Sequence, residues 1–250
     1  MDRLSAVVIA QNEEINITDC LRSLSFADEI LVCDGGSTDR TVGIAESLGA
    51  VVLHRDFDGF AEQKNYVVDQ AEGPWVLSLD ADERVTPELR TEIQGLLSIR
   101  PDDQANGYRI PRKNYLGDRW IRTGGWWPDL NLRLFKKGSG RFVQRRVHES
   151  VAVKGDVKNL KGAIEHRTYR DLSDFIARMN SYSSLAARQS LEDGKKVRPG
   201  DLTLRPLAAF LKMFVLRGGI LDGSAGYHLA VIHAVYTYSK YAKLRELLSK

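Results

Sequence analysis

The feature that most constrains the fold is a series of four short apolar segments, each followed at once by polar residues or glycines. The segments occupy residues 6–10, 29–33, 50–53 and 75–79. Helical patterns separate them, and β-branched runs that alternate with helices predict a parallel sheet with right-handed crossovers. In such sheets, ligands bind at the carboxyl ends of the strands. We therefore expect an α/β fold with its functional site where these four strands end.

The later part of the chain has a different pattern. Residues 108–170 hold many aromatic side chains and short strand-like runs, which predicts a mixed or antiparallel extension of the sheet. Residues 171–193 have the spacing of an amphipathic helix, and the Gly-, Lys- and Pro-rich stretch 194–201 is typical of a linker. Two apolar helical segments follow in 202–246. Neither reaches the roughly 20 uncharged apolar residues of a membrane-spanning helix, so we expect no transmembrane span.

Charge is divided unevenly along the chain. Residues 1–100 carry 8 basic and 19 acidic side chains, whereas residues 109–170 carry 16 basic and 5 acidic ones. An acidic half suits divalent cations, and a basic half suits phosphates, nucleic acid or an anionic membrane surface. For most of these charges, a solvated surface is explanation enough.

Cysteine usage and the first residues favour a reducing, cytoplasmic location. Two cysteines, Cys20 and Cys33, are too few for a disulfide framework or a Cys-rich zinc site. The opening residues MDRLSAVVIAQNEE place acids directly after a short apolar run, without the apolar core and cleavage site of a signal peptide.

The strongest local motif is the triplet of Asp80, Ala81 and Asp82 at the end of the fourth predicted strand. Two carboxylates separated by one residue can share a divalent cation, which also takes oxygens from a bound diphosphate. Such triplets are common in loops. The position beside two other polar strand ends favours a metal site here.

A second motif, Asp34 followed by Gly35 and Gly36, closes the second predicted strand. The glycines let a ligand approach the backbone, and Asp34 can accept hydrogen bonds from a base or ribose. A turn that leads into a helix cap is the alternative, and it accounts for residues 37–39. The glycine fingerprints of dinucleotide-binding folds and P-loops are missing, so a nucleotide would be held through an aspartate and a metal.

Taken together, VVIAQNEE, ILVCDGGSTDRT, KNYVVDQA and WVLSLDADE resemble family 2 glycosyltransferases in order and spacing. The later segments IPRKNYLGDRWIRTGGWWPD, LRLFKKGSGRF, RRVHESV and EHRTYRDL resemble the bacterial lipopolysaccharide-core branch, which adds β-linked glucose to inner-core heptose. The resemblance covers essentially the whole chain. It implies a GT-A fold, a nucleotide-sugar donor, a Mg²⁺ or Mn²⁺ ion and inversion at the anomeric carbon.

The resemblance also implies roles for individual residues. Asp34 would contact the nucleotide, Asp80 and Asp82 would hold the ribose and the metal-bound diphosphate, and Glu149 would be the catalytic base. One position departs from the family pattern: Gly35 stands where many relatives carry a second acid.

The chemistry of inverting transfer supports Glu149 separately, because a carboxylate must remove the proton of the acceptor hydroxyl. Glu149 is the one acid between Asp129 and Asp156, in a basic stretch. A surface glutamate paired with neighbouring arginines is the plain alternative. His148 is the rival base, since an imidazole titrates near neutral pH. Adjacent residues on a strand point to opposite faces, so one of the two is expected to face the site.

Further candidates carry alternatives of their own. His166 is a candidate metal or diphosphate ligand, although a lone histidine is more often structural. Lys64 and Arg84 are candidates for diphosphate contact. Tryptophans interleaved with arginines suit sugar stacking and phosphate pairing with an anionic acceptor, and a packed aromatic loop is the alternative. The acceptor candidates are Arg119, Trp120, Trp126 and Trp127.

The chain is expected to divide into a main domain, 1–193, and a helical extension, 194–250. The main domain would comprise a nucleotide-sugar-binding half, 1–100, and an acceptor half, 101–193. Basic and aromatic residues beside an apolar face in 204–250 suit a helix lying on an anionic membrane. An interface between two copies of the chain, or a lid, is the alternative.

We therefore expect an inverting, metal-dependent hexosyltransferase that moves glucose from UDP-glucose to a lipopolysaccharide inner-core or other glycolipid acceptor, at the cytoplasmic face of the inner membrane. One alternative keeps the donor and changes the acceptor to polyprenyl phosphate, a protein or another polysaccharide. The other alternative is a basic nucleic-acid-binding protein that uses residues 109–170. That stretch has no recognised nucleic-acid motif, so we expect no nucleic-acid partner.

Overall fold

The computed structural model describes residues 2–143 and 150–249, and the chain divides into two compact units. Unit 1 comprises Met1–Arg112 and Asp129–His166, and unit 2 comprises Lys113–Pro128 and Arg167–Lys250. The sequence-predicted boundary at residue 193 stays a prediction.

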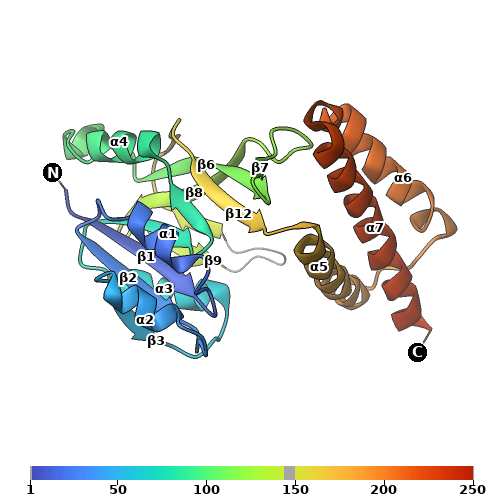
Figure 1. Ribbon diagram of the computed structural model, residues 1–250, viewed down its shortest axis with the longest axis horizontal. Helices are drawn as coiled ribbons and strands as arrows, with labels where there is room; N and C mark the ends of the chain where they lie inside the picture. The colour runs from blue at the N-terminus through green and yellow to red at the C-terminus, as the bar shows by residue number, and fades with distance from the viewer. Residues whose placement is uncertain (1, 144–149, 250) are drawn as a thin grey trace. The chain divides into compact units, whose positions relative to one another are not determined.

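Unit 1 is built on four parallel strands in the order β3-β2-β1-β4 (Figure 1). Neighbouring strands are in register at their carboxyl ends, where Ala10 lies opposite Asp34 and Ile9 lies opposite Asp80. The α/β prediction is therefore confirmed. The strands are β1 (Leu4–Ala10), β2 (Glu29–Asp34), β3 (Val51–His54) and β4 (Trp75–Asp80), and the helices between them are α1 (Ile17–Ser23), α2 (Thr41–Ser47) and α3 (Phe60–Gln70).

The predicted mixed extension is present on the other side of β4. Strand β8 pairs antiparallel with β4, and the sheet continues through β6 and β12 to β5. Two strands, β9 and β10, form a separate antiparallel pair. The elements are β5 (Glu83–Val85), α4 (Pro87–Leu96), η1 (Pro101–Asp103), β6 (Gly107–Leu116), β7 (Arg119–Trp120), β8 (Asp129–Lys136), β9 (Gly140–Val143), β10 (Ser150–Val153), β11 (Val157–Asn159) and β12 (Ile164–Tyr169).

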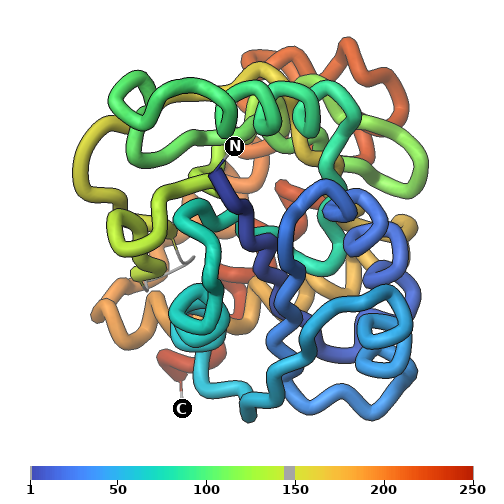
Figure 2. Tube along the Cα trace, turned by 90° about the vertical axis from the view of Figure 1, so that its left-hand side faces the viewer, coloured from blue at the N-terminus to red at the C-terminus, as the bar shows by residue number. Residues whose placement is uncertain are grey.

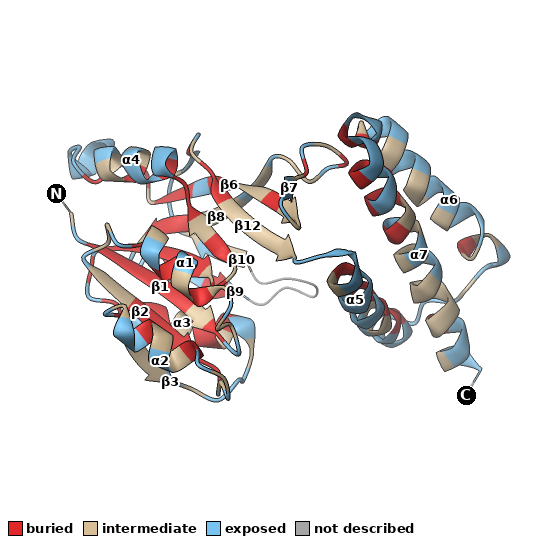
Figure 3. Cartoon of the chain, viewed as in Figure 1, coloured by how far each residue is buried: buried red, intermediate tan, exposed pale blue. Residues whose placement is uncertain are grey.

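Two hydrophobic clusters cover the two faces of the parallel sheet. Ala6 and Val8 of β1 belong to the cluster that contains α1 and α4, while Val7 packs with α3, as the alternation of side chains along a strand requires. Figure 2 shows β1, in dark blue, between α3 and the pair α1 and α2. The central strands are buried on both faces (Figure 3). Burial on both faces explains why their sequences are continuous apolar runs.

Unit 2 is mainly helical. Its hydrophobic cluster joins residues of α5, α7 and the segment between α6 and α7. Buried Asp222 ties the loop before β8 to α7, because its carboxylate accepts hydrogen bonds from the backbone of Arg122 and Thr123, at 3.1 and 2.9 Å. The elements are α5 (Leu172–Glu192), η2 (Pro199–Asp201), α6 (Leu204–Leu211), the π-helical turn η3 (Lys212–Leu216), η4 (Gly219–Asp222) and α7 (Gly223–Leu248). No helix within the described residues is both long enough and apolar enough to cross a membrane.

Candidate functional site

The carboxyl ends of the parallel strands bring three polar side chains to one edge of the sheet. Asp34 ends β2, His54 ends β3 and Asp80 ends β4, and the strand register places the first two directly opposite each other. Strands β2 and β4 lie on the two sides of β1. The chain adds β2 and β3 on one side of β1 and then returns to add β4 on the other side. This is the position at which open α/β sheets bind their ligands.

Asp34 is held firmly by the loop that follows it. Its carboxylate is 2% exposed and accepts hydrogen bonds from the backbone N–H groups of Gly36 and Ser37, at 3.1 to 3.2 Å. The Nδ1 atom of His54 lies 3.4 Å from an Asp34 oxygen. A Cβ atom at Gly35 would lie 3.1 Å from the side-chain nitrogen of Gln63. A side chain at this position would therefore require the Gln63 amide to shift by a few tenths of an ångström.

Asp80 lies between two cations. One carboxylate oxygen is 2.7 Å from the Lys64 ammonium, and the other is 2.7 Å from the Arg133 guanidinium. Burial alone would raise the pKa of Asp80, but the charges of Arg133 and Lys64 outweigh burial and hold that pKa well below its ordinary value. Asp80 is therefore ionised at neutral pH, with both oxygens already in ion pairs.

Arg133 also binds Glu83, which is completely buried. The same glutamate oxygen accepts from Arg112 at 3.0 Å, and the other accepts from the backbone N–H of Asp80 at 3.0 Å. Arg112 in turn pairs with Asp129 at 2.6 Å. This buried ion network fixes the turn between Asp80 and Glu83, which carries Asp82. Arg133 and Glu83 are not among the residues predicted from the sequence, although an arginine inside the apolar strand LNLRLF is a signal, since a buried charge needs a partner.

Asp82 and His166 are brought together from distant parts of the sequence. Antiparallel pairing of β5 and β12 places them so that the His166 Nε2 atom is 3.4 Å from an Asp82 oxygen. Both side chains are mostly buried. A carboxylate oxygen and an imidazole nitrogen form a donor pair that suits Mn²⁺, while Mg²⁺ prefers oxygen alone.

A metal at this pair would need donors from elsewhere as well. Within residues 2–143 and 150–249, no group of three or more His, Cys, Asp or Glu side chains could hold a metal ion. Diphosphate oxygens and water can fill the remaining positions, as in sites that bind a metal together with its phosphate ligand. The residues present fit a cation shared with a diphosphate, and Asp82 fits it better than Asp80, whose oxygens are already paired.

The two basic candidates for diphosphate contact have acidic partners. Lys64 is 2% exposed and binds Asp80. Arg84 lies on β5, where its Nη2 atom is 3.0 Å from Asp19. Their contact with a diphosphate stays a prediction.

The two candidates for the catalytic base, His148 and Glu149, lie outside the described residues. The strand ends on either side are described: Val143 of β9 pairs with Ser150 of β10. Strand β9 is fixed to α3, because the Asn65 side chain makes two hydrogen bonds of 2.9 Å with the backbone of Phe142. Strand β9 is therefore anchored to α3 one residue from Lys64.

The acceptor candidates belong to unit 2. Trp120 and Trp127 form an edge-to-face pair with centroids 5.3 Å apart, and Arg122 lies 4.7 Å from the centre of the Trp120 ring. Trp126 instead packs in the hydrophobic cluster of unit 2, and Arg119 donates to the Asp222 carbonyl oxygen. Trp120 and Trp127 are thus the pair whose geometry suits a sugar contact.

Comparison with known sequences gives consistent matches. A family model described as glycosyl transferase family 2 matches residues 5–150. The chain is 33% identical to the lipopolysaccharide core biosynthesis glycosyltransferase LpsC of Rhizobium meliloti, covering 96% of this chain and 91% of the relative. It is 32% identical to the uncharacterized glycosyltransferase RT0209 of Rickettsia typhi, covering 100% of this chain and 89% of the relative.

Solved structures with the same fold include two with bound nucleotides. The mannosyltransferase PcManGT from Pyrobaculum calidifontis, in complex with GDP-Man and Mn²⁺, aligns with a TM-score of 0.54 and 15% identity, covering 98% of this chain and 87% of that chain. TarS from S. aureus in complex with UDP aligns with a TM-score of 0.50 and 16% identity, covering 99% and 91%. At these identities the likeness concerns the fold alone.

The buried ion network predicts a large cost for removing its central cation. Arg133→Met leaves Asp80 and Glu83 without their shared partner, so we expect the free energy of unfolding to fall by about 3–5 kcal/mol. Arg141→Met is the matched control: its ion pair with Asp69 is exposed, and its loss should cost about 0–1 kcal/mol. Urea denaturation followed by circular dichroism measures both. Equal losses in the two variants would contradict the role given to Arg133.

Proposed function

Because the chain belongs to glycosyl transferase family 2, we propose that it is an inverting, metal-dependent hexosyltransferase that moves glucose from UDP-glucose to the inner core of lipopolysaccharide or a related glycolipid. The glycosyltransferase activity and the GT-A fold expected from the sequence are confirmed. The choice between an enzyme and a nucleic-acid-binding protein is thereby made in favour of the enzyme. The donor, metal and acceptor are our proposals.

The observation that carries the proposal is the pair of Asp82 and His166 beside the ionised Asp80, at the sheet edge where Asp34 also ends a strand. Asp34 would accept hydrogen bonds from the nucleotide, and Asp80, oriented by two cations, would accept from the ribose. Related folds with bound UDP and with bound GDP-Man and Mn²⁺ support a nucleotide-sugar donor.

Asp82 and His166 would hold a divalent cation. When bound, this cation supplies positive charge to the departing diphosphate. The protein's own contribution is to fix both ligands: the buried ion network holds the turn of Asp82, and strand pairing holds His166. Preorganised ligands reduce the reorganisation needed during transfer.

Glu149 is proposed as the base that takes the proton of the acceptor hydroxyl. Inverting transfer is a single displacement, so this proton must be removed on the side of the sugar opposite the leaving diphosphate. The strand that precedes this segment, β9, is anchored to α3, and α3 also carries Lys64, the partner of Asp80.

The proposed acceptor is an anionic glycolipid. Two observations support it: the relative named for lipopolysaccharide core biosynthesis, and the strongly basic stretch 109–170. Sugar rings stack on aromatic side chains, and cations pair with phosphates, so the Trp120–Trp127 pair with Arg122 suits such an acceptor.

We also propose that unit 2 rests on the cytoplasmic surface of the inner membrane. The segment α6–η4 exposes a row of large apolar side chains, and Leu216 and Leu221 are each 80% exposed. Figure 3 shows how much of α6 is exposed. Lys212 and Arg217 lie among these residues and are exposed too. Apolar side chains flanked by cations match an anionic bilayer surface.

The first test of the function measures UDP release from UDP-glucose in the presence of Mn²⁺ and delipidated lipopolysaccharide core. We expect release by the full chain, and a loss of at least about 100-fold in Asp82→Asn, since charge stabilisation of the leaving group is lost. Asp69→Asn, an exposed aspartate on α3, is the control and should keep its rate. Full activity of Asp82→Asn without added metal would contradict the metal site. Release only with polyprenyl phosphate, a protein or another polysaccharide would replace the acceptor.

The second test concerns the base. Glu149→Gln keeps the size of the side chain but cannot take a proton, so transfer should fall by roughly 10² to 10⁴ while UDP-glucose still binds. His148→Gln is the matched control and should be milder. The opposite result would make His148 the base, and two active variants would place the base outside this dipeptide.

The third test is sedimentation with vesicles of phosphatidylcholine and phosphatidylglycerol. Leu216→Gln/Leu221→Gln should lower the bound fraction at low salt by at least about tenfold in partition coefficient, because two apolar side chains no longer enter the bilayer. Leu185→Gln/Leu191→Gln changes two exposed leucines of α5 and should bind as the unchanged protein does. If Leu216→Gln/Leu221→Gln binds vesicles as the unchanged protein does, the α6–η4 face does not bind the membrane. If the variant instead disrupts a dimer, this face is an interface between two copies of the chain.

A further inference from the structure

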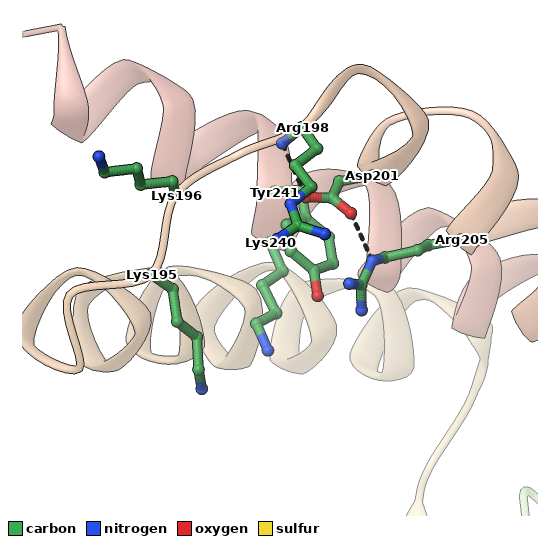
Figure 4. Close-up of a pocket in the computed structure, with 7 residues that line it drawn as sticks. All are labelled: Lys195, Lys196, Arg198, Asp201, Arg205, Lys240 and Tyr241. Carbon is green, nitrogen blue, oxygen red and sulfur yellow. Dashed lines mark hydrogen bonds and ion pairs between the residues drawn. The ribbon is translucent and has the colours of Figure 1, made fainter.

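A cavity of about 500 Å³ lies within unit 2. Its lining comes from the segment between α5 and α6, which includes η2, and from helices α6 and α7 (Figure 4). The volume is within the range of roughly 300 to 1,000 Å³ that small-molecule sites occupy. The lining residues are Lys195, Lys196, Arg198, Asp201, Arg205, Lys240 and Tyr241.

The lining of this basic pocket holds five basic side chains and one acid, and one of the five, Lys195, also pairs with Asp193 at 3.0 Å. That acid, Asp201, is buried and uses both oxygens within the protein: one accepts from the Arg205 Nε atom, and the other accepts from the backbone N–H of Arg198 at 2.8 Å. Asp201 thus orients Arg205 through Nε, and the two Nη atoms of Arg205 are not used in that ion pair. Asp201 therefore positions Arg205, and the basic side chains of the lining remain in excess.

The Tyr241 ring brings two of the cations together. The Arg205 guanidinium lies 5.0 Å from the centre of this ring, and the Lys240 ammonium lies 5.5 Å from it. Figure 4 shows Lys196 pointing away from the other side chains of the lining. Partial burial lowers the pKa of Lys240, the charges of Lys195 and Arg205 lower it further, and the charge of Asp193 opposes them in part. The cations therefore repel one another, and an anion among them would relieve that repulsion.

We propose that the basic pocket binds a phosphate monoester carried by a lipid headgroup. Arginine matches phosphate oxygens in a bidentate manner, and lysine adds a point charge, so Arg198, Arg205 and Lys240 together suit a doubly charged phosphate. Exposed leucines on α6, among them Leu204 next to Arg205, provide an apolar surface for the lipid chains. All of these residues belong to unit 2, so this binding does not depend on the proposed transfer reaction.

The first arm of the test uses a soluble phosphate monoester, glycerol 3-phosphate, titrated into the full chain by calorimetry. Arg198→Gln/Lys240→Gln removes two cations, and we expect its affinity to be at least about tenfold weaker. Arg188→Gln removes an exposed cation of α5 that does not line the pocket, and this variant should bind glycerol 3-phosphate as the unchanged protein does. Thermal unfolding checks whether the double variant is stable. If it is not, Lys195→Gln replaces it, because this single change at an exposed lining residue should also weaken the binding of glycerol 3-phosphate, by a smaller factor.

The second arm uses phosphatidylcholine vesicles that contain either phosphatidic acid, a monoester, or phosphatidylglycerol, a diester. Stronger binding to phosphatidic acid that the double variant loses, and Arg188→Gln keeps, supports the proposal. Binding of glycerol 3-phosphate without any preference for phosphatidic acid vesicles would overturn the lipid source and leave a soluble phosphate ligand. A double variant that binds both probes as well as Arg188→Gln does would overturn the pocket itself.

Discussion

Arg133 places a permanent positive charge inside the sheet, between two carboxylates, and the geometry of the site depends on it. A buried charge without a partner destabilises a protein strongly, so Arg133 requires Asp80 and Glu83 to stay where they are. Lys64 and Arg112 complete the network from α3 and β6. Because Glu83 also binds the backbone of Asp80, the turn between them is fixed at both ends.

This network joins the acidic part of the sequence to the basic part that follows it. The acidic side chains at the ends of the parallel strands come from the first part of the chain, while Arg112 and Arg133 come from the basic part that follows. Antiparallel pairing of β8 with β4 brings the two sets together. The candidate site therefore forms when the mixed extension docks on the parallel strands, and it has no counterpart in either part alone.

The two units have different chemical surfaces. Unit 1 carries paired carboxylates at a sheet edge, which suits a nucleotide and a cation, whereas unit 2 carries exposed leucines on α6–η4 and a basic pocket next to Tyr241. An enzyme with a membrane-borne acceptor needs both kinds of surface, one for the donor and one for the lipid. The assignment of these surfaces to donor and lipid rests on the proposals above.

The sequence by itself determined the parallel sheet, its mixed extension, the helical C-terminal part and the family. The short apolar runs are local signals, because their length and composition are typical of buried strands. Asp34 and Asp80 are local signals too, because each marks the end of its strand. Only the tertiary structure decided what these acids contact. The Asp82–His166 pair depends on strand pairing between residues 84 positions apart, and the pairing of Asp80 with Arg133 depends on a similar long-range register. No local pattern encodes such contacts, because they arise when distant strands are packed at one edge. The same reason applies to the basic pocket. Lys195, Lys196 and Arg198 lie in the stretch that is typical of a linker, and they meet Arg205 and Lys240 only when α6 and α7 pack together.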